Sequence, residues 1–300
     1  MKKDFLCIQD MTSTDVESIF NLASELKTQQ NQGQTKQLLA GKTLAMIFHK
    51  PSIRTRISFD VAMFQLGGHT IKMTEQDAEF GKRESIPDIA RTLSRFVDAI
   101  MIRTFDQEQV EELAKHASIP VINGLTDSSH PCQALTDLFT IKEKAIDCAK
   151  MKFTYIGDGN NVARSLINLA ALMNFNLHIA SPRGYQPEAE LLRVSPTVTI
   201  HKDLQKAVAD ADVVYTDTWA SMGQEDEAAE RAKVFAKFQL NRKLLDLAKP
   251  TAYVMHCLPA HRGLEITDEV IDSAQSIVFD QAENRLHVQK AILVKLMSKC

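Results

Sequence analysis

Short apolar runs alternate with helical stretches along most of this 300-residue chain, and this alternation strongly constrains its fold. The run 44–48 is apolar and is followed by apolar residues at helical spacing over 54–66. Further strands are expected at 70–73, 99–102, 120–122, 152–156, 177–180, 198–200, 213–215 and 252–255. Strands that alternate with helices predict an α/β fold built on parallel sheets.

Two domains are expected, because 300 residues exceed what a single core ordinarily accommodates. The first would span 1–145 and the second 146–280, each a parallel sheet flanked by helices. A long helix that opens at Pro131 would join them. The first helix is expected to begin at Thr14, with Glu17 as its capping-box partner. A terminal helix over 281–299 could pack on either domain by its pattern alone.

The composition is that of a globular protein, with 44 % hydrophobic and 24 % charged residues. A net charge of −3 argues against a nucleic-acid or membrane partner, and no apolar run reaches transmembrane length. Asp4 and Asp10 interrupt the N-terminal region, which argues against a signal peptide. The cysteines form no CxxC pair, which favours the cytoplasm over a disulfide framework or a zinc site: Cys7, Cys132, Cys148, Cys257 and Cys300.

The segment 52–56, Ser-Ile-Arg-Thr-Arg, stands where a predicted strand gives way to a helix. A helix N-terminus offers unpaired N–H groups and a partial positive charge, to which Ser, Thr and Arg add further donors. A capped helix with solvated arginines is the alternative. Because cations oppose the helix dipole at this end, Arg54 and Arg56 favour a site for phosphate or a similar dianion.

Other polar clusters also fall at the carboxyl ends of predicted strands: Arg103, the segment before His130, Asn160 with Asn161, Asp217, and His256 with Cys257. Ligands of open α/β sheets bind at this edge of the sheet. We therefore expect a single cleft between the two domains.

Each of these residues also has a purely structural interpretation. Arg103 could be solvated at the sheet edge, and His130 could be a structural histidine. At a helix start, however, His130 could donate to a carbonyl oxygen on which negative charge develops. Asp217 could bind an ammonium group or belong to an ordinary surface loop. Cys257 could be catalytic or a buried, inert thiol.

Gly157-Asp158-Gly159 follows a strand and opens a helix, as a dinucleotide-binding motif would. Val162 stands at the third glycine position, however, and no acidic residue ends the next strand, so a nicotinamide cofactor is not expected. The two asparagines could instead hold a carboxylate or an amino group. The segment 221–223 could be mobile and close over a ligand.

Together these motifs resemble the transcarbamylase family, in order and over nearly the whole chain. Ser-x-Arg-Thr-Arg at 52–56, His-Pro-x-Gln at 130–133 and Glu-Asn-Arg at 283–285 are similar to motifs of enzymes that use carbamoyl phosphate. Asp-x-Trp-x-Ser-Met-Gly at 217–223 and His-Cys-Leu-Pro at 256–259 resemble the ornithine branch of the family rather than the aspartate branch.

The resemblance implies that residues 1–145, completed by a returning helix at 281–300, bind carbamoyl phosphate and that residues 146–280 bind L-ornithine. It implies transfer of the carbamoyl group to the side-chain amine of L-ornithine, giving L-citrulline and phosphate, in arginine biosynthesis or in the reverse catabolic direction. It also implies a homotrimer, or a multiple of trimers, with active sites near subunit interfaces. No metal or organic cofactor is expected.

The family's site residues transfer to this chain motif by motif. Phosphate contacts would come from Ser52, the Ile53 backbone N–H, Arg54, Thr55 and Arg103. The carbamoyl group would contact Thr55, Arg103, His130, Gln133, the carbonyl groups of Cys257 and Leu258, and Arg285. Ornithine would contact Asn161, Asp217, Ser221 and Met222. The catalytic residues would be Arg103, His130, Asp217 and Cys257, which stabilise the developing oxyanion or take up the amine proton.

Two alternatives stay open. The amine could be a different one, such as putrescine or an acylated ornithine, although the Ser-Met-Gly segment favours the α-carbon groups of free ornithine. The chain could also be a non-catalytic paralogue that binds carbamoyl phosphate or a protein partner. The presence of His130, Asp217 and Cys257 argues against that possibility.

Two positions depart from the family's pattern. Ile53 replaces a threonine, which removes one hydroxyl contact but keeps the backbone N–H. Glu79 replaces a glutamine in a loop expected to reach the phosphate of a neighbouring subunit, where a carboxylate would be repulsive.

We predict that Lys82 or Arg83 supplies the phosphate contact and that Glu79 turns away from it. Lys82→Ala or Arg83→Ala should then raise the KM for carbamoyl phosphate, because a cation that contacts the dianion is lost. Steady-state kinetics checks this prediction, and an unchanged KM in both variants would contradict it.

Overall fold

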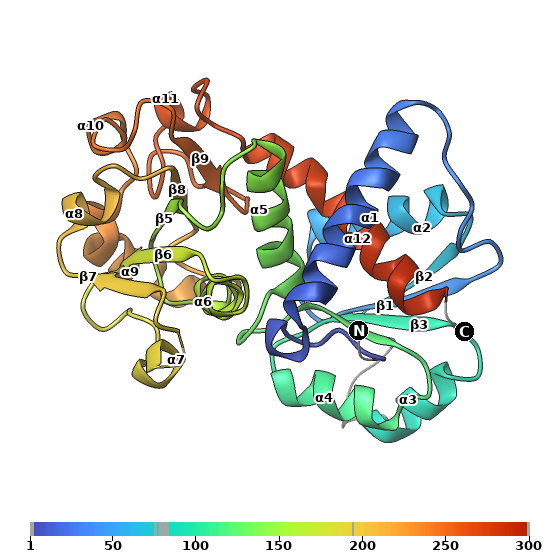
Figure 1. Ribbon diagram of the computed structural model, residues 1–300. Coiled ribbons are helices and arrows are strands. Elements are labelled where there is room, and N and C mark those ends of the chain that lie inside the picture. The colour runs from blue at the N-terminus through green and yellow to red at the C-terminus, as the bar shows by residue number, and fades with distance from the viewer. Residues whose placement is uncertain (1–2, 75–76, 78–83, 194, 299–300) are drawn as a thin grey trace. The chain divides into compact units, whose positions relative to one another are not determined.

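The computed structural model describes residues 3–74, 77, 84–193 and 195–298. The chain divides into two compact units, residues 1–139 with 283–300 (unit 1) and residues 140–282 (unit 2). The divisions fall within the helices α5 (Pro131–Glu143) and α12 (Val278–Met297). Each unit contains one parallel sheet flanked by helices (Figure 1). The predicted α/β class with two parallel sheets is therefore confirmed.

The sheet of unit 1 has four parallel strands in the order β2-β1-β3-β4. Their bounds are β1 Thr43–Phe48, β2 His69–Thr74, β3 Ala99–Arg103 and β4 Val121–Leu125. β1, β3 and β4 are almost entirely buried, whereas the edge strand β2 is largely exposed. Phe48 pairs with Arg103, and Arg103 with Leu125, so β1, β3 and β4 end at the same level.

Helix α1 (Ser13–Asn31) begins at a capping box, in which a side chain and the backbone hydrogen-bond to each other reciprocally. Its cap is Thr12, whose hydroxyl accepts from the Asp15 N–H at 3.1 Å while the Asp15 carboxylate accepts from the Thr12 N–H at 3.1 Å. The predicted start at Thr14 with Glu17 is therefore wrong by two residues, because Thr12 has the extended backbone that a cap requires. The other helices of this part are η1 Ile8–Asp10, α2 Ile53–Gln65, α3 Ile86–Leu93 and α4 Gln107–His116.

The last helix, α12, packs on unit 1 from residue 283 onward. Lys27 on α1 donates to Asn284 Oδ1 at 2.8 Å, and Lys295 on α12 donates to Ser18 Oγ at 2.6 Å. Figure 1 shows the red α12 beside the blue α1. The return of the C-terminal helix to the first domain is thereby confirmed, although the apolar pattern alone left it open.

Unit 2 has five parallel strands in the order β7-β6-β5-β8-β9, each within one residue of its predicted bounds. They are β5 Lys152–Ile156, β6 Asn176–Ala180, β7 Val198–His201, β8 Val213–Thr216 and β9 Tyr253–His256. The helices are α6 Asn161–Met173, α7 Ala189–Arg193, α8 Leu204–Val208, η2 Glu225–Glu227, α9 Ala228–Phe235, η3 Ala236–Phe238, α10 Arg242–Leu245 and α11 Asp268–Ile271. Among the described residues, no helix is long and apolar enough to cross a membrane.

Two histidines of neighbouring strands form a pair at the edge of this sheet. His178 Nδ1 on β6 lies 2.7 Å from His201 Nε2 on β7, and the rings stack with centroids 5.0 Å apart. A hydrogen bond between two ring nitrogens needs one N–H and one lone pair, so it is lost when both rings are protonated. Burial, with help from the positive charge of Lys152, lowers the pKa of His178 to about 4 and lowers the pKa of His201 as well.

We predict that this pair makes unit 2 less stable in acid. A folded state with lowered histidine pKa values binds fewer protons than the unfolded chain, so stability falls as the pH drops from about 6.5 towards 4. Thermal unfolding from pH 7.5 to 4.5 checks this in the wild type and in His178→Gln, with His69→Gln at an exposed position as the control. The loss of Tm should be smaller in His178→Gln than in the other two proteins. Parallel Tm curves for all three would contradict the prediction.

Candidate active site

Helix α2 begins directly after Ser52, which caps it. The Ser52 hydroxyl accepts from the Thr55 N–H at 3.2 Å and donates to Thr55 Oγ1 at 3.1 Å. The Ile53 side chain is 74 % exposed while Thr55 is buried, so these side chains lie on different faces of the first turn. This placement agrees with a role for Ile53 through its backbone N–H rather than through its side chain.

Arg285 on α12 connects this helix start to the start of α5. Its Nη1 donates to Gln133 Oε1 at 2.7 Å and its Nη2 donates to Thr55 Oγ1 at 3.4 Å. The Gln289 amide oxygen accepts from Arg285 Nη2 at 2.9 Å in the orientation that satisfies both ends of that amide. Thr55 Oγ1 accepts from Ser52 and from Arg285, so its own O–H can be directed at a ligand. Four predicted site residues therefore come together from two helix starts, those of α2 and α5, and from the distant helix α12.

His130 is buried directly before α5, within the electrostatic reach of three arginines. Burial, together with the positive charges of Arg285, Arg103 and Arg54, holds the pKa of His130 well below its ordinary value. The imidazole is therefore neutral at pH 7 and can donate a hydrogen bond without carrying a charge. Arg103, itself buried, reaches this group from the end of β3.

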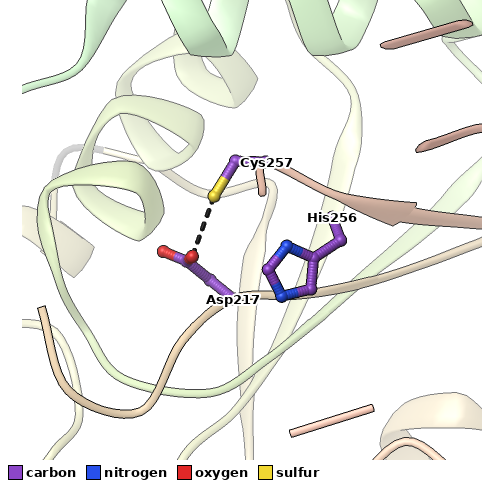
Figure 2. A group of neighbouring side chains, drawn as sticks. All are labelled: Asp217, His256 and Cys257. Atoms are coloured by element: carbon purple, nitrogen blue, oxygen red, sulfur yellow. Dashed lines mark hydrogen bonds between the residues drawn. The ribbon is translucent and has the colours of Figure 1, made fainter. Parts of the chain in front are cut away.

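Asp217 follows β8 and is the centre of a hydrogen-bonded group in unit 2 (Figure 2). Its Oδ1 accepts from Cys257 Sγ at 2.8 Å and from the Thr218 N–H at 2.7 Å. Its Oδ2 accepts from Asn160 Nδ2 at 2.7 Å. The structure thus joins Asp217 to Cys257, the two residues expected to handle the amine proton, and three donors fix the carboxylate in one orientation.

His256 supports the backbone of the loop that follows β9. Its Nδ1 accepts from the Leu258 N–H at 2.8 Å, so Nε2 carries the proton and donates to Glu265 Oε1 at 3.2 Å. Both side chains are buried, and Leu258 has a positive φ of 56°. The His256–Glu265 pair therefore holds the segment whose carbonyl groups, those of Cys257 and Leu258, are predicted to contact the carbamoyl group.

Asp217, His256 and Cys257 also offer three ligand atoms that all lie within 4.8 Å of one another, so they could hold a metal ion. Both ring nitrogens of His256 already form hydrogen bonds, and Cys257 already donates to Asp217. A metal ion bound by all three residues would have to break these bonds.

Asn160, the residue before Asn161, donates a hydrogen bond to Asp217. Asn160 Oδ1 caps α6 by accepting from the N–H groups of Val162 at 2.9 Å and Ala163 at 3.2 Å. Both asparagines were predicted as possible ligand contacts from their place at a helix start, and the family resemblance assigned ornithine to Asn161, the first residue of α6. The preference of asparagine for helix caps was the signal that could have identified Asn160 as the residue that orients Asp217.

The loop that carries Ser221 and Met222 lies between β8 and α9. Its first part is anchored, because the Arg231 guanidinium donates to the Trp219 carbonyl at 3.0 Å and to Asp158 at 2.8 Å. Ser221 donates through its backbone N–H to Gln224 Oε1 at 3.0 Å, and the Met222 side chain is exposed. Sequence reasoning did not single out Arg231, since its contacts join distant segments.

Glu79, Lys82 and Arg83 lie outside the described residues, so the roles predicted for them stay predictions. The expected cleft between domains also stays a prediction, since the two groups of residues lie in separate units.

Two parallel-sheet units, one with hydroxyl and guanidinium groups gathered at a helix start and one with an Asp–Cys pair, suit a carbamoyltransferase. Residues 3–143 match the carbamoyl-P binding domain of aspartate/ornithine carbamoyltransferases, and residues 149–296 match the Asp/Orn binding domain. The chain therefore belongs to the aspartate/ornithine carbamoyltransferase family.

Its similarity to individual members extends over their full length. The anabolic ornithine carbamoyltransferase of Pyrococcus furiosus is 52 % identical over 98 % of this chain and 96 % of its own. The structure of the Pyrococcus furiosus ornithine carbamoyltransferase matches with a TM-score of 0.96 at 51 % identity, covering 99 % of this chain and 97 % of that one. The anabolic enzyme of Campylobacter jejuni matches with a TM-score of 0.93 at 37 % identity over 100 % of both chains.

We predict that His130 does not titrate in the physiological range. Because burial and three arginines lower its pKa well below the ordinary value, its ring should stay neutral at neutral pH in the folded protein. Histidine-selective NMR over pH 5.5–8.5 measures this, and His130→Asn identifies the signal by its loss. A His130 signal that titrates at or above the ordinary histidine pKa of about 6.5 would contradict the prediction.

Proposed function

We propose that this chain transfers the carbamoyl group of carbamoyl phosphate to the side-chain amine of L-ornithine and releases L-citrulline and phosphate. The proposal rests on the Arg285 guanidinium, which donates to Thr55 at the start of α2 and to Gln133 at the start of α5, next to the buried His130. The full-length similarity to ornithine carbamoyltransferases supports the same reaction.

Unit 1 would bind carbamoyl phosphate through its strand ends and helix starts. The phosphate group suits the first turn of α2, where Ser52, Arg54 and Thr55 add donors to the helix N-terminus. The carbamoyl group would lie against His130, Gln133 and Thr55. On this account residues 1–145 with 281–300 form the domain for carbamoyl phosphate and residues 146–280 the domain for ornithine. The family matches support this order of the two domains, although the Asp/Orn match runs to residue 296. The packing of residues 283–300 on unit 1 supports placing the last helix in the first domain.

The chemical step joins the ornithine nitrogen to the carbamoyl carbon and breaks the bond from that carbon to the phosphate oxygen. The ornithine side-chain amine is protonated at neutral pH, so it must lose a proton before its lone pair can attack. Asp217 is the proposed acceptor or positioning group, with Cys257 bonded to it at 2.8 Å. Phosphate leaves with the bonding electron pair.

The tetrahedral intermediate would carry negative charge on the former carbonyl oxygen. His130, Arg103 and Thr55 are proposed as the donors to that oxygen, and buried, fixed donors stabilise such charge more than water does. A neutral His130 suits this role, because it donates without adding a fourth positive charge to the three arginines.

The substrate amine would be recognised by Asn161, Asp217, Ser221 and Met222 in unit 2. The anchored start and exposed tip of the segment around Ser221 suit a loop that closes over the α-carbon groups of ornithine. The names of the Pyrococcus furiosus and Campylobacter jejuni relatives include the word anabolic, which favours the biosynthetic direction for this chain. The scattered cysteines, without a CxxC pair, support a place in the cytoplasm.

We also propose a homotrimer or a multiple of trimers. Helix α2 presents an exposed apolar face of Ile53, Ile57 and Phe64, which are 74 %, 54 % and 80 % exposed in the isolated chain. Exposed apolar patches of this kind mark interaction surfaces, and a subunit contact would cover this one next to the phosphate site. The mass of the active protein in solution tests the oligomeric state.

Steady-state product formation tests the reaction. With carbamoyl phosphate present, citrulline formation from L-ornithine should exceed carbamoylation of putrescine or N-acetylornithine by about 100-fold or more in kcat/KM, because a site built for polar groups rejects analogues that lack them. A higher kcat/KM for either analogue would show that this analogue, rather than ornithine, is the substrate. A folded protein that binds carbamoyl phosphate without any turnover would favour the non-catalytic alternative.

A further inference from the structure

Lys50 is a buried cation that the reaction as described does not use. It lies in the loop between β1 and α2, two residues before Ser52, and its side chain is 3 % exposed. Lysine is rarely buried to this extent, because removing an ammonium group from water is costly unless partners compensate. Its partners therefore indicate what the residue does.

The Lys50 ammonium has two partners on two other loops of unit 1. It forms a hydrogen-bonded ion pair with Asp127 in the loop after β4. It also lies 4.2 Å from the centroid of the Phe105 ring, which belongs to the loop after β3. The Lys50 side chain, from the loop after β1, thus contacts Phe105 in the loop after β3 and Asp127 in the loop after β4.

Backbone hydrogen bonds hold the same three loops side by side. The His49 N–H donates to the Arg103 carbonyl at 2.9 Å, and the Asp127 N–H donates to the Phe105 carbonyl at 2.8 Å. Each loop carries part of the proposed carbamoyl-phosphate site within a few residues: Ser52 after β1, Arg103 at the end of β3, and His130 three residues after Asp127. The spacing of these three groups depends on how the loops are held.

A second lysine, just before the other end of β1, provides the comparison. Lys42 precedes β1 and pairs with Asp98 before β3 at 2.9 Å, with the side chains 28 % and 31 % exposed. Lys42 therefore joins the same two strands at their opposite ends, away from the site. Lys50 differs in being buried and in reaching the third loop.

We propose, on the basis of the proposed function, that Lys50 is a positioning residue for carbamoyl phosphate. Its ammonium, held by Asp127 and Phe105, fixes the start of α2 against the segments that carry Arg103 and His130. The phosphate contacts and the carbonyl contact then have a fixed separation before the substrate binds, which lowers the cost of ordering the site.

Lys50→Met tests the proposal, because it removes the charge and keeps the length of the side chain. The KM for carbamoyl phosphate and the dissociation constant of inorganic phosphate should each rise about tenfold, whereas the KM for ornithine should change by less than about threefold. Lys50→Arg should recover most of the affinity, since it restores the cation. Lys42→Met is the matched control and should leave all three constants near wild type.

Asp127→Asn is a second variant that removes the charge pairing between Lys50 and Asp127. Because Asp127 is 57 % exposed, its replacement should leave the fold intact. It should raise the phosphate dissociation constant in the same direction as Lys50→Met. Equal phosphate affinities in Lys50→Met, Asp127→Asn and Lys42→Met would overturn the proposal. So would a rise in both substrate KM values together with a loss of Tm, since that pattern indicates a merely structural role.

The phosphate titration separates this proposal from the proposed function. If the wild type makes no citrulline, the function fails, yet a weakened phosphate affinity in Lys50→Met still supports the positioning role. If the wild type is active and Lys50→Met binds phosphate as the wild type does, the positioning role alone fails.

Discussion

The guanidinium of Arg285 joins three helices that lie far apart in the sequence. It donates to Thr55 at the start of α2 and to Gln133 at the start of α5, while the rest of its helix packs on α1. A buried cation of this kind is tolerated only when its donors are paired, so the first and last parts of unit 1 depend on one another. Burial lowers the pKa of His130, and the positive charge of this guanidinium lowers it further, so His130 stays neutral at pH 7.

The polar side chains at the strand ends of unit 2 gather around a carboxylate, whereas those of unit 1 gather around guanidinium groups. Asp217 accepts from Cys257, Thr218 and Asn160, so groups that follow β5, β8 and β9 are brought to one point at the carboxyl ends of the strands. A cationic site in one unit suits the phosphate, and an anionic site in the other suits the ornithine amine. This division of charge follows from which strand ends carry which side chains.

Periodicity and residue type were sufficient to predict the alternating strands and helices, and therefore the strand ends at which the polar clusters stand. The supporting contacts were not predictable in this way. Asn160 on Asp217, Glu265 on His256 and Asp127 on Lys50 are side-chain bonds between segments that only the tertiary fold brings together. The start of α1 was misplaced because Thr12 and Thr14 both suit a cap, and only the backbone conformation decides between them. The site roles themselves came from the family resemblance rather than from local pattern.

A crystal structure of the protein with carbamoyl phosphate, or a stable phosphonate analogue, would show directly which residues bind each end of the substrate. We expect phosphate oxygens within hydrogen-bond distance of the first-turn N–H groups of α2 and of the guanidinium groups of Arg54 and Arg103. We also expect the carbonyl oxygen to accept from His130. A phosphate group bound elsewhere, with no contact to the start of α2, would contradict this expectation.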